Sequence, residues 1–181
     1  VIDYGDLPWT AAEVNNLILS SVKCIASVEG EESLCVIEHF PFTSILGDVS
    51  YKENYLEGGD DDFRLTRMLK RYEKPEDTSA SDFLSYLLTR WKLVNSDGSF
   101  VYSEEDTYLI VSRRFDMDYK NFGPDSPYIL CEDASIRVLS SVLELNLRGI
   151  STTMTADRVY MYPGYMSHIL GKTGKIPAEQ A

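Results

Sequence analysis

The chain has 181 residues, of which 44% are apolar, 12% aromatic and 25% charged, and its formal net charge is −12. This length and composition exclude general disorder and allow a core that needs neither disulfides nor a metal. The three cysteines are odd in number, unlike a secreted disulfide scaffold, and the apolar stretches are too short to span a bilayer. We expect an intracellular protein, cytoplasmic or nuclear. It forms a single domain over residues 1–181, in which residues 171–181 are a tail that is flexible or docked on a partner.

Acidic side chains are concentrated in the first third of the chain. Residues 1–62 hold 13 acidic and 2 basic side chains, whereas residues 63–181 hold 16 acidic and 15 basic ones. A field of this kind repels nucleic acid and anionic lipid and attracts a basic protein surface. We therefore expect a protein partner, possible self-association included, and neither nucleic acid nor a membrane span. Solubility alone is the simpler explanation of the charge.

A helix and a strand are the first predicted elements. Thr10 and Glu13 have the spacing of a capping box, and apolar residues recur behind them at helical spacing. This pattern predicts a helix over about residues 11–27. Residues 33–40 are rich in apolar side chains and end at Pro41, which predicts a strand. Residues 47–62 are typical of a loop.

Helices and then a β-meander are predicted in the middle of the chain. Three aspartates precede an apolar stripe, and negative charge favours a helix start. Ser79 or Ser81 is placed to cap the next helix. The sequence Asn95-Ser96-Asp97-Gly98 is a turn signature between two apolar segments. The predicted elements are helices at about residues 61–73 and 81–91 and strands at about 91–94, 99–103 and 107–112.

The last third of the chain predicts a loop, a helix and a strand. Two prolines, a glycine and several Asp and Asn residues make residues 116–127 a loop. Residues 132–148 predict the strongest helix, with acidic residues at its start and Gly149 as its C-cap. Residues 158–162 predict a last strand. Without strict βαβ alternation, the expected fold class is α+β, with about four helices packed on a mainly antiparallel sheet of roughly four to six short strands.

The candidate binding residues lie around the second predicted helix. Five of the 17 basic residues of the chain fall within eleven positions there, and four of them share one helical stripe. Such a basic face suits an acidic protein partner or a phosphate group, and it equally suits the acidic first third of the same chain. The preceding run of aspartates is a second candidate, for a hard cation. The residues concerned are Arg64, Arg67, Lys70, Arg71 and Lys74, together with Asp60, Asp61 and Asp62.

No catalytic, cofactor or metal motif is predicted. Gly171-Lys172-Thr173 resembles part of a phosphate-binding loop, but the required earlier glycine is replaced by Met166. Cys35 and His39 share one face of the predicted strand, but lie about 13 Å apart there, too far for a nucleophile–base pair. No paired cysteine or histidine spacing suits zinc. Asp116 and Asp118 have the same-face spacing of an acid–base pair if that segment is extended.

These observations favour a non-enzymatic protein–protein interaction or assembly module with an acidic first third and one basic helix. A viral accessory or structural protein, an inhibitor and a complex subunit all fit. The alternative is a hydrolase with a dispersed site that uses carboxylates together with His39 or His168, or Cys35 together with His39. A second alternative is an acidic mimic of nucleic acid formed by residues 1–62.

Overall fold

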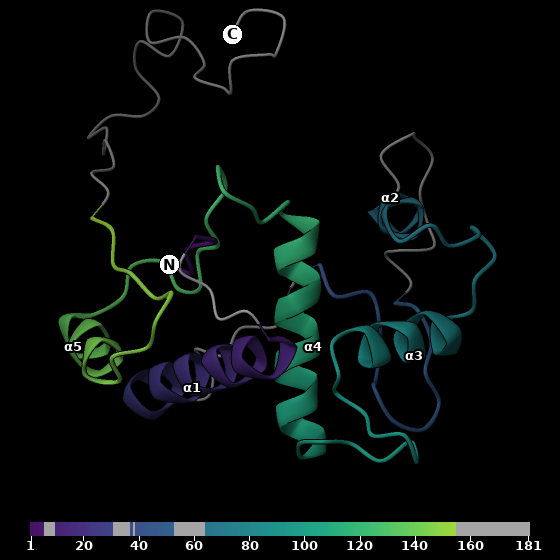
Figure 1. The fold of residues 1–181 in the computed structure, drawn as a ribbon, viewed down its shortest axis with the longest axis horizontal. Coiled ribbons are helices and arrows are strands. Elements are labelled where there is room, and N and C mark those ends of the chain that lie inside the picture. The colour runs from purple at the N-terminus through teal and green to yellow at the C-terminus, as the bar shows by residue number, and fades with distance from the viewer. Residues whose placement is uncertain (6–9, 31–36, 38, 53–63, 155–181) are drawn as a thin grey trace, which may run out of the picture.

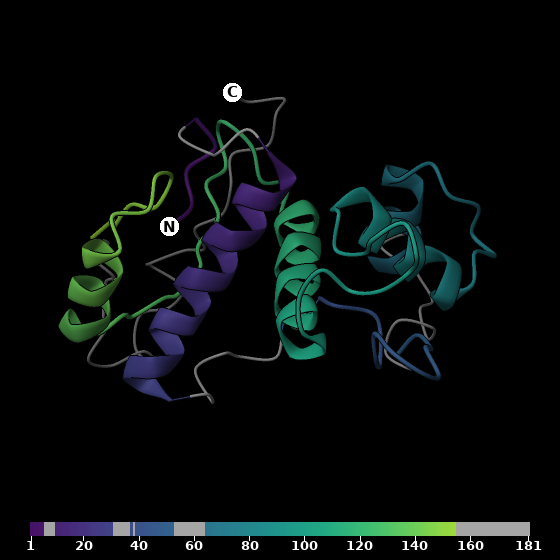
Figure 2. The same cartoon turned by 60° about the horizontal axis from the view of Figure 1, so that its bottom comes forward.

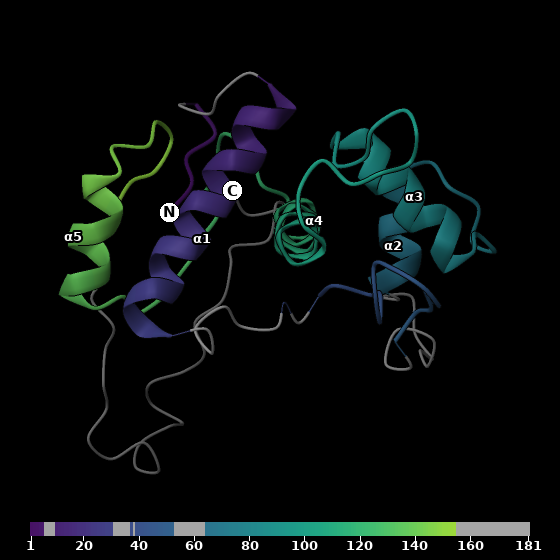
Figure 3. The same ribbon diagram turned by 90° about the horizontal axis from the view of Figure 1, so that it is seen from below.

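The computed structural model describes residues 1–5, 10–30, 37, 39–52 and 64–154. Within these residues, one central helix stands between two groups of elements (Figure 1). Helices α1 and α5 lie on one side of α4, and α2 and α3 lie on the other side, as the views in Figures 2 and 3 also show. The helices are α1 (Ala11–Glu29), α2 (Arg64–Arg71), α3 (Ala80–Arg90), α4 (Glu104–Tyr119) and α5 (Ile136–Glu144).

The predicted α+β fold with a sheet is wrong. The described part of the chain contains five helices and no strand, and its β-type pairing is limited to isolated bridges. Two of those bridges join Ile2 to Tyr128 and to Ile150. Residues 1–3 therefore lie as a short extended segment between two later segments, but the pairing does not grow into a sheet.

Local signals place the first helix correctly. The Glu13 backbone N–H donates to Thr10 Oγ1 at 3.2 Å, and Glu13 Oε2 accepts from the Thr10 backbone N–H at 3.2 Å. This reciprocal capping box satisfies two N–H groups that a helix start would otherwise leave without partners. The helix ends at Gly30, whose φ of 91° suits a residue without a Cβ. The predicted helix over residues 11–27 is confirmed.

Helix α4 occupies the segment for which a buried strand was predicted at residues 107–112, and that prediction is wrong. Ser103 caps the helix by accepting from the Asp106 backbone N–H at 3.1 Å, and three acidic residues occupy the first turn. The apolar run from Tyr108 to Val111 shows no helical period because the helix is covered on two sides. Tyr108 packs against one apolar cluster and Leu109 against another.

The predicted hairpin around residues 95–98 is a tight turn only. Gly98 has a φ of 84°, and its backbone N–H donates to the Asn95 carbonyl at 3.0 Å, so the turn is confirmed. The flanking strands reduce to one bridge between Val94 and Phe100. The two predicted strands at 91–94 and 99–103 are therefore wrong.

Helices α2 and α3 confirm the predicted helices at residues 61–73 and 81–91 within a few residues. Helix α5 is shorter than the predicted 132–148, because Asp133 has a φ of 50° and cannot belong to a right-handed helix. Ser135 caps it instead. The predicted strand at 33–40 lies largely outside the described residues, as do the strand at 158–162 and the tail at 171–181.

The core consists of three apolar clusters joined by two helices. Helix α4 contributes Phe115 to the cluster around α2 and α3, and Met117 to the cluster around the first half of α1. Helix α1 in turn contributes Ile25 to a third cluster with Val138 and Val142 of α5. The order α5, α1, α4, α3 in space therefore follows from apolar faces that each helix shares with its neighbours. No helix among the described residues is long and apolar enough to cross a membrane.

Phe83 of α3 packs against three other aromatic rings of the first cluster, and its replacement tests that core. Its ring is fully buried, with centroids 5.7 Å from Phe42, 5.7 Å from Tyr72 and 6.3 Å from Phe115. Phe83→Ala is expected to lower the free energy of unfolding by about 3–5 kcal/mol, because it leaves a cavity among rigid rings. Urea denaturation followed by circular dichroism measures this loss.

Ser85→Ala, at an exposed position of the same helix, is the matched control and is expected to change the free energy of unfolding by less than about 0.5 kcal/mol. Similar losses for the two variants would show that α3 is not packed through Phe83.

Candidate functional site

A buried polar contact joins the two sides of the molecule at α4. The Asn15 side chain of α1 is fully buried, and its Nδ2 donates to the Trp91 carbonyl at 2.9 Å. Its Oδ1 accepts from Nε and Nη2 of Arg114 at 3.0 and 2.9 Å. Arg114 Nη2 also donates to the Ala11 carbonyl at 2.8 Å. Burial lowers the pKa of Arg114 to about 10, so the guanidinium stays charged near neutral pH.

The two carboxylates near the end of α4 are held separately. Asp116 is only 2% exposed, accepts from the Tyr128 hydroxyl at 2.7 Å and forms an ion pair with Lys120 at 3.0 Å. Asp118 accepts from the Tyr72 hydroxyl of the segment after α2. Burial, and then the nearby carboxylate, raises the pKa of both tyrosines. Because residues two apart on a helix do not face each other, Asp116 and Asp118 do not form an acid–base pair.

Two of the predicted basic residues meet at the C-terminal end of α4. The Arg67 guanidinium lies 5.3 Å from the Tyr119 ring centroid, and its Nη2 donates to the Tyr119 carbonyl at 3.5 Å. Arg71 Nη1 donates to Asn121 Oδ1 at 2.5 Å. The last turn of α4 has no basic residue of its own. Helix α2 therefore supplies the positive charge that the carbonyl end of a helix favours.

The other predicted binding residues are not gathered into one site. Lys70 makes an exposed ion pair with Glu76 at 3.6 Å, and Lys74 Nζ lies 3.9 Å from the Tyr86 ring centroid. Asp60, Asp61 and Asp62 lie outside the described residues, as does the Arg64 side chain. A role of these residues in binding a partner stays a prediction.

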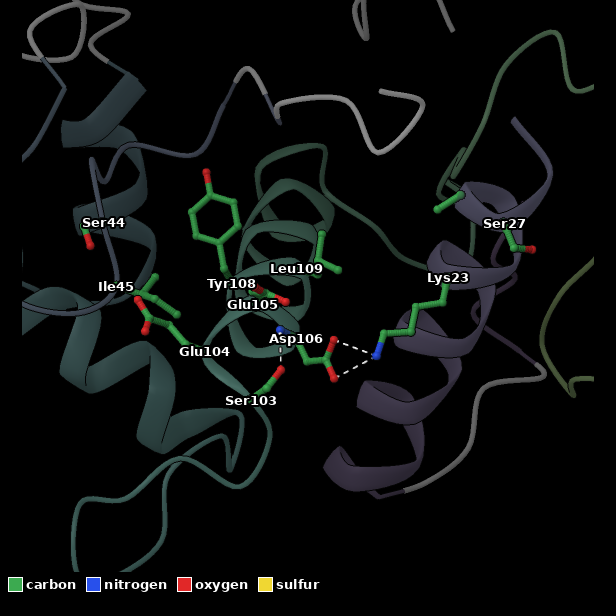
Figure 4. A pocket seen from close by; sticks show the side chains of 11 residues that line it. Lys23, Ser27, Ser44, Ile45, Ser103, Glu104, Glu105, Asp106, Tyr108 and Leu109 are labelled. Carbon is green, nitrogen blue, oxygen red and sulfur yellow. Dashed lines mark hydrogen bonds and ion pairs between the residues drawn. The ribbon is translucent and has the colours of Figure 1, made fainter. Parts of the chain in front are cut away.

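An open cleft of about 1040 Å³ lies between α1 and the N-terminal half of α4 (Figure 4). Lys23 and Asp106 point toward each other across it and form an ion pair at 2.8 Å. Glu104 and Glu105 add two carboxylates to its wall. No group of three metal-binding side chains occurs in the part of the chain that the structure describes. Lys23 and Asp106 thus pair within the chain, and the lining of the cleft also includes the apolar residues Ile45 and Leu109.

The Cys35–His39 hypothesis concerns a residue that is not described. Cys35 lies outside the described residues, and the His39 ring stacks on Tyr119 with centroids 4.3 Å apart. His39 thus packs beside the C-terminal end of α4.

Exposed large apolar residues are concentrated in one stretch of the sequence, residues 129–154. Eight large apolar residues are exposed among those described, and five of the eight fall between residues 129 and 154. None of these five residues belongs to one of the three core clusters. Ile136 is 81% exposed and Met154 is 95% exposed. Grouped apolar exposure is typical of surfaces that bind another protein. The five residues are Ile129, Ile136, Leu143, Leu145 and Met154.

The family model of the Penicillin-binding Protein dimerisation domain matches residues 50–181 of the chain. The chain belongs to this family. The match spans α2 to α5, including the α4 contacts and the exposed residues near α5. No curated protein and no solved structure matches the chain.

Membership in this family corrects the functional prediction. A viral protein and a module defined by an acidic first third with one basic helix are both wrong, because the matched region is that of a penicillin-binding protein. A dimerisation domain fits the coarser expectation of a protein partner or self-association. The expectations that nucleic acid is not bound and that the chain is intracellular stay predictions.

Family membership raises the question of a serine nucleophile within the described residues. Penicillin-binding proteins use Ser-X-X-Lys, Ser-Asp-Asn and Lys-Thr-Gly motifs in acylation. Ser20 and Lys23 have the first spacing, and no Ser-Asp-Asn occurs in the sequence. Lys23 points to Asp106 across the cleft and forms an ion pair with it at 2.8 Å. The Lys-Thr-Gly at 172–174 lies outside the described residues.

The Asn15–Arg114 contact is tested by a double substitution. Asn15→Leu is expected to lower the free energy of unfolding by about 3 kcal/mol, because it leaves a buried guanidinium short of acceptors. Combining it with Arg114→Met is expected to recover most of that loss, because the double variant buries no charge. Urea denaturation of the two single variants and the double variant measures the coupling.

Asn16→Ala, at the neighbouring exposed position, is the control and is expected to cost less than about 1 kcal/mol. Additive effects of the Asn15 and Arg114 substitutions would contradict the contact.

Proposed function

We propose that this chain is the region through which a penicillin-binding protein, a bacterial cell-wall synthesis protein, associates with a second copy of itself. The observation that carries the proposal is the match of residues 50–181 to the dimerisation domain of that family. The family is described as a dimerisation domain, which supports self-association of this chain.

The described geometry supports a binding role. Three of the strongest polar groups, Arg114, Asp116 and Lys23, are paired within the chain, so they serve the fold. Five of the eight large apolar residues that are exposed among the described residues lie between residues 129 and 154. Burying such surface on association is favourable by about 25 cal/mol per Å². Two copies are therefore held together mainly by apolar contact, with charges deciding the register.

Helix α5 is held in place by its contacts with α1, which favours its use as a binding surface. Helix α5 packs through Val138 and Val142 on Ile25 of α1, and α1 is fixed to α4 through Asn15. The exposed residues near α5 are therefore presented by a supported element. A presented surface that is already ordered loses less entropy when two copies meet.

The proposal predicts a reversible dimer of the full 181-residue chain. Sedimentation equilibrium at a series of protein concentrations is expected to show the monomer mass at low concentration and twice that mass at high concentration. Raising the salt concentration is expected to weaken the dimer only slightly, because apolar burial dominates. A single monomer mass at every concentration would contradict the proposal.

A further inference from the structure

Helix α5 has one buried face and one exposed face. Val138 and Val142 are buried against Ile25 of α1, at 2% and 8% exposure. On the opposite side Ile136 is 81% exposed and Leu143 is 55% exposed. Figures 1, 2 and 3 agree that α5 lies at the end of the described molecule farthest from α2 and α3, with α1 on one side of it.

Helical spacing defines what the exposed face of α5 contains. With about 3.6 residues per turn, Ser140 lies directly opposite the buried valines. Ile136 and Leu143 flank it on one side, and Arg137 and Glu144 flank it on the other. All five side chains are exposed. The face thus carries an apolar strip beside a charged strip, with a small residue in the middle.

Residues 136–145 form a palindrome of residue classes. Read from either end, the sequence is apolar, charged, apolar, apolar, serine. The two charged positions carry opposite signs, Arg137 from one end and Glu144 from the other. A two-fold contact centred on this segment sets Arg137 of one copy against Glu144 of the other, because each position meets its symmetry-related partner.

We propose that the exposed face of α5 packs antiparallel against the same face of a second copy, across a two-fold axis near Ser140. This proposal rests on the proposed function and names the surface through which the two copies associate. In this arrangement Ile136 of one copy faces Leu143 of the other, and Arg137 faces Glu144. The two pairings imply axes that differ by one residue, about 1.5 Å, so one axis serves both.

Charge selects this arrangement over the parallel one. A parallel pairing across a two-fold axis sets the charged strip of each copy against the apolar strip of the other, so Arg137 and Glu144 lose solvent without gaining an opposite charge. The antiparallel pairing sets apolar strip against apolar strip and Arg137 against Glu144 at both ends. Ser140 at the crossing point has a short side chain, so the two helices approach closely enough for Ile136 and Leu143 to touch.

Charge reversal in the full chain tests the pairing. Arg137→Glu and Glu144→Arg are each expected to raise the dimer dissociation constant about tenfold, because each places like charges in both symmetric contacts. Combining the two substitutions restores opposite charges and is expected to return the constant to near its original value. Sedimentation equilibrium measures all three variants. Lys92→Glu, a charge reversal at an exposed position after α3, is the matched control and is expected to have no effect.

A second variant separates self-association from folding. Ile136→Ser is expected to raise the dissociation constant at least about tenfold, without changing the free energy of unfolding measured on the dilute monomer. A lower free energy of unfolding with unchanged dimerisation would show that the chain itself covers this face, and would overturn the proposal.

The outcomes distinguish the α5 contact from self-association of the chain in general. A dimer that is unaffected by the α5 substitutions, or that weakens equally with Lys92→Glu, overturns the α5 contact and leaves the proposed function intact. A double variant that fails to recover overturns the antiparallel register. An unmodified chain that stays monomeric overturns the proposed function.

Discussion

A charged guanidinium at the junction of three helices constrains the rest of the structure. Arg114 of α4 is largely buried, and such a charge is tolerated only where acceptors surround it. Asn15 and the Ala11 carbonyl supply those acceptors from α1, and the other end of the Asn15 amide binds the Trp91 carbonyl at the end of α3. Three elements from distant parts of the sequence must therefore meet in one geometry for the charge to be satisfied.

Helix α4 extends this constraint over the whole described molecule. Its apolar residues belong to two clusters, one with α2 and α3 and one with α1. Its N-terminal turn is acidic and pairs with Lys23, and its C-terminal end receives Arg67 and Arg71 from α2. Charge of the right sign thus stands at each end of the helix dipole. Helix α5 takes its position from α1, so the surface proposed for association depends indirectly on α4.

Sequence patterns predicted the elements that local contacts determine and missed those that distant contacts determine. The capping box of Thr10 and Glu13 and the turn at Gly98 involve neighbouring residues, so their patterns were sufficient. Helix α4 was taken for a strand because burial on two sides removes the helical period from residues 108–111. The expected sheet depended in part on that error and on residues 91–94 and 99–103, which form only the bridge between Val94 and Phe100.

The candidate site shows the same division. The basic stripe of α2 was visible in the sequence, but no pattern indicated that Arg67 and Arg71 contact the end of α4. Asn15 and Arg114 are 99 residues apart, and neither belongs to a motif. The palindrome of α5 was readable from the sequence, but it has meaning only once the structure shows which face of the helix is exposed.

Hydrogen–deuterium exchange of the full chain, followed by mass spectrometry, tests most directly whether α4 unites the two sides. If it does, peptides from α1 and from α3 exchange only through the same rare global opening. Their opening free energies then agree within about 1 kcal/mol. The contrary result is an α3 peptide that exchanges through a smaller opening while α1 stays protected, which would mean that the two clusters unfold independently.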